Sequence, residues 1–195
     1  AVDGDGNIYI AFSNSADAST YPDNDVYIIR SSDNGLSWTQ PLNISNDPKP
    51  NFSVVIAVDG SNIYTAWLEA EDYRVHFGRS TDTGENWSLS SFDAGHLSLN
   101  EILSIAVDSY GNVNLVWDDA WDHVYFSRSV DNGAIWSQPR EIPNYLNSRR
   151  FNPQMVVDNQ GDIMVVWSAD FSNDNIYEVY LTRSVDYGEN WGFPV

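Results

Sequence analysis

Four acidic segments, spaced along the whole chain, carry the residue types best suited to ligand chemistry. In each of them several carboxylates stand beside an aromatic residue. Carboxylates accept hydrogen bonds from sugar hydroxyls while an aromatic ring stacks on the sugar; they also ligate Ca²⁺ or attract a basic peptide. A solvated acidic rim without a ligand is the alternative interpretation. The candidate ligand-binding residues of these segments are Asp23, Asp25, Glu71, Asp72, Tyr73, Asp119, Trp121, Asp122 and Asp174.

Residues for a catalytic or metal centre are sparse. The three histidines have no metal-ligand spacing between them, and cysteine is absent. The sequence contains no glycine-rich phosphate loop, nucleophile elbow or zinc motif. The run Asp3-Gly4-Asp5-Gly6-Asn7 is similar to the start of a calcium loop, but its copies elsewhere lack the second aspartate. We therefore expect no catalytic residue and no cofactor in this chain, with Ca²⁺ as the open alternative.

The charge balance excludes some partners. The chain has 9 basic and 28 acidic residues, a net charge of −19. Neutralising phosphates needs clustered Lys and Arg, so nucleic acid and anionic membrane surfaces are unexpected partners. No run is long and apolar enough to insert into a bilayer. A 14% aromatic content indicates a folded chain, and the acidic surface suits a soluble extracellular or cell-surface protein.

A segment of the form Ser-x-Asp-x-Gly-x-x-Trp, called the box below, occurs four times. Its aspartates, Asp33, Asp82, Asp131 and Asp186, are 49, 49 and 55 residues apart. A second block, Ala-Val-Asp or Val-Val-Asp followed by a turn and an apolar stretch, recurs in register with the box. Such self-similarity indicates a repeat architecture. We place the repeats approximately at 1–48, 49–98, 99–150 and 151–195, within a single domain that covers residues 1–195.

Each repeat is expected to form four short antiparallel strands. Stretches such as Ile8-Tyr9-Ile10-Ala11-Phe12 are apolar on both faces, so the sheet must be covered on both sides. Pro41, Pro139 and Pro194 each follow a box tryptophan by three residues. Because proline cannot donate to a ladder, this fourth strand belongs at the outer edge. These features predict an all-β fold of β-propeller blades.

The box residues have a local structural explanation. The aspartate can accept N–H groups of the hairpin turn, the glycine supplies a positive φ, and the tryptophan ring packs beneath the turn. An arginine also precedes every box at one equivalent position, and this repetition indicates a structural role with a neighbouring carboxylate as partner. These arginines are Arg30, Arg79, Arg128 and Arg183.

The box resembles the Asp-box, or BNR, repeat of sialidases and related β-propellers, and the resemblance covers essentially the whole chain. It is specific for fold rather than function, since the box occurs in glycosidases, sorting receptors, assembly factors and adhesins. Sialidases of this family bind a substrate carboxylate through three arginines, the first in an Arg-Ile-Pro motif. The nearest match here is Phe151-Asn152-Pro153, which lacks the arginine. Arg149 and Arg150, in the connection between the third and fourth repeats, remain candidates for contact with an acidic ligand.

Intact boxes without that motif favour a non-catalytic binding or adhesion module of a secreted or cell-surface protein. We expect it to recognise a glycan or a protein through its acidic loops, which lie on the face opposite the box turns. The alternatives are a sialidase-like glycoside hydrolase with catalytic residues on blades missing from this chain, and a structural repeat protein of a filament or surface layer. Four blades could close alone, but we favour further blades in the same polypeptide or a second copy of the chain, as in a dimeric ring.

Overall fold

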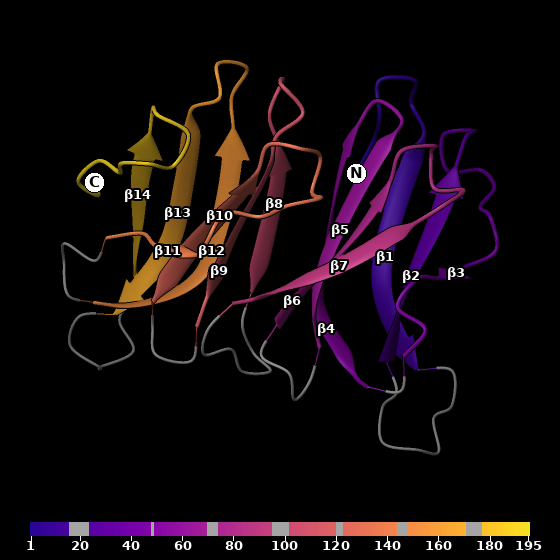
Figure 1. Cartoon of the computed structure of the whole chain (residues 1–195), viewed down its shortest axis with the longest axis horizontal. Helices are drawn as coiled ribbons and strands as arrows, with labels where there is room; N and C mark the ends of the chain where they lie inside the picture. Colours follow the sequence, from indigo (N-terminus) through magenta and orange to yellow (C-terminus); the bar gives the residue numbers. More distant parts are fainter. Residues whose placement is uncertain are drawn as a thin grey trace. The chain divides into compact units, whose positions relative to one another are not determined.

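The computed structural model describes residues 1–15, 24–47, 49–69, 74–94, 102–119, 123–143, 148–170 and 177–195. These residues form four antiparallel sheets and contain no helix (Figure 1). The all-β prediction is therefore confirmed. Accordingly, the described part of the chain has no helix that could cross a membrane.

The chain divides into two compact units, residues 1–93 and 94–195, each with two sheets. In unit 1, sheet 1 contains β1 (Ile8–Ser15), β2 (Asn24–Ser31) and β3 (Leu42–Asn43), and sheet 2 contains β4 (Asn51–Asp59), β5 (Asn62–Glu69), β6 (Arg74–Ser80) and β7 (Ser88–Asp93). In unit 2, sheet 3 contains β8 (Leu103–Val107), β9 (Val113–Asp118), β10 (Val124–Ser129) and β11 (Arg140–Glu141), and sheet 4 contains β12 (Arg149–Val157), β13 (Ile163–Asp170) and β14 (Glu178–Ser184).

Each unit has a hydrophobic core between its two sheets. In unit 1, Val26 and Ile28 of sheet 1 pack with Trp67 of sheet 2. In unit 2, Phe126 of sheet 3 packs with Trp167 and Trp191 of the fourth repeat, and the Phe126 and Trp191 ring centroids are 5.5 Å apart. Strands that are apolar on both faces are thus used as expected, because one face meets the neighbouring sheet.

Proline precedes a short fourth strand in the first and third repeats. After Pro41 and Pro139, β3 and β11 are only two residues long. The second repeat has Ser90 in this place, and β7 there runs for six residues. β3, β7 and β11 all lie at the edge of their sheets, which confirms the prediction from proline.

The four boxes fold alike. In the first, the Asp33 carboxylate accepts bonds from the Ser31 hydroxyl (2.7 Å) and from the Ser37 N–H (2.9 Å) and hydroxyl. These bonds, those from Ser37 foremost, lower the pKa of Asp33 to about 2. The next two residues, Asn34 and Gly35, have φ of 58° and 85°. The same pair of positive φ values recurs in every box, with Thr83 and Tyr187 in place of asparagine in the second and fourth. The box is therefore a rigid turn held by its aspartate.

Candidate ligand-binding groove

The predicted acidic loop face falls largely outside the described residues. This is the case for Asp23, Glu71, Asp72, Tyr73, Trp121, Asp122 and Asp174. Asp25, Asp119, Arg149 and Arg150 are described, and their positions follow.

The two described carboxylates are engaged within the protein. Asp25 accepts bonds from Asn43 Nδ2 (2.7 Å), Ser45 Oγ (2.9 Å) and the Asp47 N–H (3.3 Å). Asp119 is buried and lies 2.8 Å from the His123 N–H and 3.0 Å from its Nδ1. Both side chains therefore order the ends of strands β2 and β9. Each would need to exchange an internal bond in order to contact a ligand.

The two candidate arginines differ sharply, although both begin β12 instead of lying in a connection. Arg150 is fully buried, and its guanidinium donates to the Ile142 carbonyl (2.6 Å) and to Glu141 Oε1 (2.7 Å). Burial lowers its pKa, and Glu141 opposes that shift. Arg149 is exposed and lies over the Phe151 ring, with 5.0 Å between Cζ and the ring centroid. Arg150 therefore joins sheets 3 and 4, and Arg149 is the one within reach of solvent.

A bulge in β12 occupies the place of the arginine motif. Pairing with β13 shifts between Phe151 and Gln154, and Asn152 has φ of 53°. The Asn152 N–H donates to the buried carboxylate of Asp118 (2.9 Å), which also accepts the Ile102 N–H (2.7 Å). A cavity of 420 Å³ lies beside this bulge, lined by Asp118, Phe151, Asn152, Ser168 and Tyr177.

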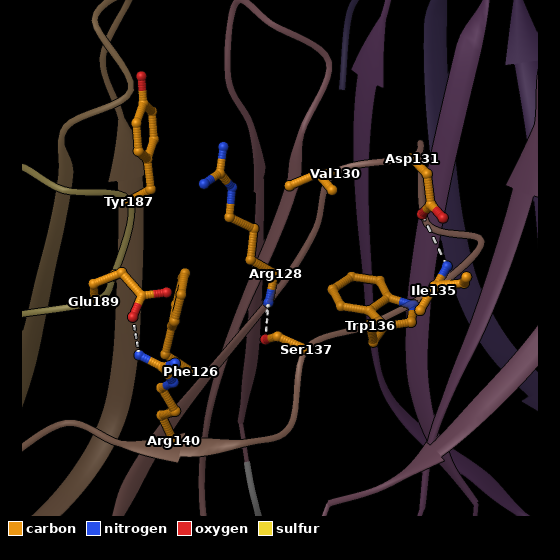
Figure 2. Close-up of a pocket in the computed structure, with 11 residues that line it drawn as sticks. Phe126, Arg128, Val130, Asp131, Ile135, Trp136, Ser137, Arg140, Tyr187 and Glu189 are labelled. Carbon is orange, nitrogen blue, oxygen red and sulfur yellow. Dashed lines mark hydrogen bonds and ion pairs between the residues drawn. The ribbon is translucent and has the colours of Figure 1, made fainter.

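A second cavity, of 390 Å³, lies between sheets 3 and 4 on the side of the box turns. We call it the 3–4 groove. Figure 2 shows Trp136 and Tyr187 on opposite sides of Arg128, with Phe126 and Ser137 below them. The groove combines aromatic surface with charged and hydroxyl groups. Its lining residues are Phe126, Arg128, Val130, Asp131, Ile135, Trp136, Ser137, Arg140, Tyr187, Gly188 and Glu189.

Two arginines supply the donors of the groove. Arg128 lies over the Tyr187 ring, 4.3 Å from its centroid, and its Nη2 is 3.6 Å from Asp108 Oδ2. Arg140 forms an ion pair with Glu189, and the two side chains are 51% and 63% exposed. The Arg140–Glu189 pair is therefore open to solvent and can offer both donors and acceptors to a ligand. It also borders a smaller cavity of 140 Å³ that reaches toward Trp191.

The box turn of the fourth repeat closes one side of the groove because it lies directly on sheet 3. A Cβ added to Gly188 would stand 2.2 Å from Phe126 Cε1, so only glycine allows this approach. On the opposite wall, hydrogen bonds from the Ile135 N–H and the Ser129 hydroxyl lower the pKa of Asp131. The Asp131 carboxylate is thereby committed to its own turn, whereas Glu189 faces solvent as part of its ion pair with Arg140.

The sequence predicted structural roles for the box residues and for Arg128, and it gave no indication of the 3–4 groove. The expected pairing of the repeated arginines is found for Arg128 with Asp108 and for Arg183 with Asp162, while Arg30 donates instead to Asn7 Oδ1. One signal did distinguish the site, since Tyr187 stands where two other boxes have asparagine. Asparagine suits a positive φ better than tyrosine, and the Tyr187 ring contacts Arg128 at the groove.

Comparisons with known proteins place the chain in a family. The family model described as a BNR repeat-like domain matches residues 2–192. No curated protein matches the sequence. Among solved structures, a protein of unknown function from Dyadobacter fermentans has 16% identity and a TM-score of 0.70 over 100% of this chain and 66% of its own.

Two further structures are a lectin and an enzyme. The Aleuria aurantia lectin, in complex with Fucα1-6GlcNAc, has 14% identity and a TM-score of 0.64 over 97% of this chain and 57% of its own. A Streptococcus pneumoniae sialidase has 18% identity and a TM-score of 0.60 over 89% of this chain and 28% of its own. The chain thus spans less than two thirds of each of these three structures. Identities this low support the fold alone, but the family model covers nearly the whole sequence. The chain belongs to the BNR repeat-like domain family.

Proposed function

We propose that this chain is a non-catalytic carbohydrate-binding module of a secreted or cell-surface protein, and that it holds a neutral glycan in the 3–4 groove. The observation that carries the proposal is the exposed Arg140–Glu189 pair in a groove that Trp136 and Tyr187 also line. A sugar ring can stack on an aromatic face while its neighbouring hydroxyls bond to a guanidinium and a carboxylate. The glycan-bound lectin of similar fold supports this class of ligand.

Charge favours a neutral glycan over an acidic one. The chain carries a net charge of −19, which repels anionic ligands at long range. Both arginines of the groove already have a carboxylate partner: Arg128 faces Asp108, and Arg140 faces Glu189. An acidic sugar would therefore compete with carboxylates already in place, whereas a neutral sugar can bond to both partners of the Arg140–Glu189 pair.

A glycan array followed by calorimetric titration with the strongest neutral glycan tests the proposal. Tyr187→Asn removes one aromatic wall and installs the residue that two other boxes use, so the turn should fold normally. We expect affinity to fall by at least about tenfold, or ~1.4 kcal/mol. Tyr110→Asn is the matched control, because Tyr110 is 66% exposed in unit 2 and does not line the groove. Equal affinity in native and Tyr187→Asn proteins would refute the groove as the site.

The acidic loops remain a second proposed surface for a glycan or protein ligand. Their described members, Asp25 and Asp119, bond internally, so we assign recognition there to the loop residues around them. Titration of the same glycan into a variant with Asp23 and Asp72 changed to asparagine tests this assignment. An affinity loss in that variant, with none in Tyr187→Asn, would move the site to the loops.

The competing function is a sialidase-like glycoside hydrolase completed by further blades. It is favoured by the sialidase of similar fold and by the cavity that holds the buried Asp118 beside Tyr177. Asp118 accepts two backbone N–H groups, which suits a fixed structural carboxylate. We expect no hydrolysis of a fluorogenic sialoside by this chain. Turnover that Asp118→Asn abolishes would replace the binding proposal with the enzymatic one.

We also propose that further blades, in the same polypeptide or a second copy, cover the outer face of sheet 4. Val156 and Val179, 57% and 73% exposed, lie on that face. The chain's partial coverage of the similar structures supports this arrangement. Intact mass in the native source and sedimentation of the isolated chain test it. A monomer of 22.0 kDa in both experiments would contradict it.

A further inference from the structure

Unit 1 contains a groove in the equivalent place, between sheets 1 and 2. Its volume is 250 Å³, and we call it the 1–2 groove. Counted from the box aspartates, Arg30 and Thr39 correspond to Arg128 and Ser137 of the 3–4 groove. Gly84 and Glu85 correspond in the same way to Gly188 and Glu189. The two grooves are therefore built by the same positions of successive repeats.

Arg30 contacts both sheets that form the 1–2 groove, as Arg128 does in the 3–4 groove. Its guanidinium donates to Asn7 Oδ1 (3.1 Å) in the first turn of its own repeat, and to Thr83 Oγ1 (3.2 Å) in the box turn of the next. Its Cζ lies 5.7 Å from the centroid of the Tyr9 ring. The arginine thus ties two neighbouring sheets together, and the space in front of it is a reproducible product of the repeat.

Two substitutions give the 1–2 groove a different chemistry. Leu42, 44% exposed, stands in the place of Arg140, and Thr83 stands in the place of Tyr187. Glu85 is exposed and lines the groove together with Leu42, whereas its counterpart Glu189 pairs with an arginine. A carboxylate beside an aliphatic wall suits a neutral sugar that offers both hydroxyls and an apolar edge.

We propose that the 1–2 groove is a second site for neutral carbohydrate, so that each unit of the chain binds one glycan. This inference rests on the proposed carbohydrate-binding function. The second site should be weaker by about tenfold or more, because it lacks both the aromatic wall and the arginine–glutamate pair. Two sites in one chain would raise the avidity for a surface that displays many copies of the glycan.

Nuclear magnetic resonance can read the two grooves separately. Three neutral probes, the methyl glycosides of L-fucose, D-galactose and N-acetylglucosamine, are titrated into ¹⁵N-labelled chain. The amides of Gly188 and Glu189 report on the 3–4 groove, and those of Gly84 and Glu85 report on the 1–2 groove. We expect one probe to shift both pairs, with the unit 1 pair saturating at a concentration about tenfold higher.

A matched pair of variants assigns the signals. Glu85→Ala should abolish the unit 1 shifts and leave those of unit 2, while Glu189→Ala should do the reverse. Shifts confined to the 3–4 groove would overturn the second site and leave the proposed function standing. An absence of shifts in both grooves with all three probes would overturn the proposed function, and the second site with it.

Discussion

Replacement of Gly188 by alanine tests how closely the fourth box lies on sheet 3. The new Cβ would stand 2.2 Å from Phe126 Cε1 and 2.8 Å from Cδ1 and Cζ, so the ring or the turn must move. Overpacking of this kind costs about 1–3 kcal/mol. Gly188 also has φ of 85°, where an alanine loses about 1 kcal/mol more. We therefore expect a total loss of about 2–4 kcal/mol in the free energy of unfolding.

Gly35→Ala is the matched control, because Gly35 occupies the same box position at φ 85°. The atoms nearest to its added Cβ are at 3.8 Å, so only the backbone cost of about 1 kcal/mol applies. Equilibrium urea denaturation, followed by circular dichroism, gives the free energy of unfolding for both variants. Equal losses in the two variants would refute the close contact between the fourth box and Phe126.

A double variant strengthens the test. Phe126→Leu removes the ring atoms that the new Cβ meets, so it should relieve part of the damage done by Gly188→Ala. We expect the two changes to couple by about 1–2 kcal/mol in a double-mutant cycle. Strict additivity would mean that the cost arises in the turn alone.

Three further outcomes follow from the described contacts. The pKa values of Asp33 and Asp82 are lowered to about 2, so the stability that these ionised carboxylates give the fold is complete above about pH 4 and is lost as the pH falls toward 2. Urea midpoints of the native protein should therefore decrease between pH 5 and pH 2.5, and the decrease should be smaller in Asp82→Asn. Arg150→Ala should lower the free energy of unfolding by about 2–4 kcal/mol, whereas Arg149→Ala should change it by less than about 0.5 kcal/mol; equal effects in urea denaturation would contradict the burial of Arg150. Thr83→Asn should raise the thermal midpoint, since a β-branched residue is strained at φ 59°, and a lower midpoint would show that the Thr83 hydroxyl matters more than the strain.

The repeat explains why so much of the fold could be predicted. The structure of the box is determined locally, because Asp33 accepts a hydrogen bond from within the turn and Gly35 provides its positive φ. Proline acts locally too, so Pro41 and Pro139 predicted the edge position of β3 and β11. Features set by neighbouring residues are therefore visible in the sequence alone.

The grooves and the buried arginine could not be predicted in the same way. Arg150 was predicted to lie in a connection, available to an acidic ligand, because the sequence does not show that Ile142 and Glu141 of the preceding repeat accept its hydrogen bonds. Tyr187 and Trp136 come from different repeats, and only the packing of sheet 4 on sheet 3 brings them to one groove. Chemistry formed between repeats depends on their packing, which single-sequence patterns do not encode.

A crystal structure of the chain with its strongest neutral glycan tests the central claim most directly. We expect a sugar ring in the 3–4 groove beside Tyr187, with adjacent hydroxyls hydrogen-bonded to Arg140 and Glu189. A glycan bound instead among the acidic loops around Asp25 or Asp119, with the 3–4 groove occupied by solvent, would contradict it.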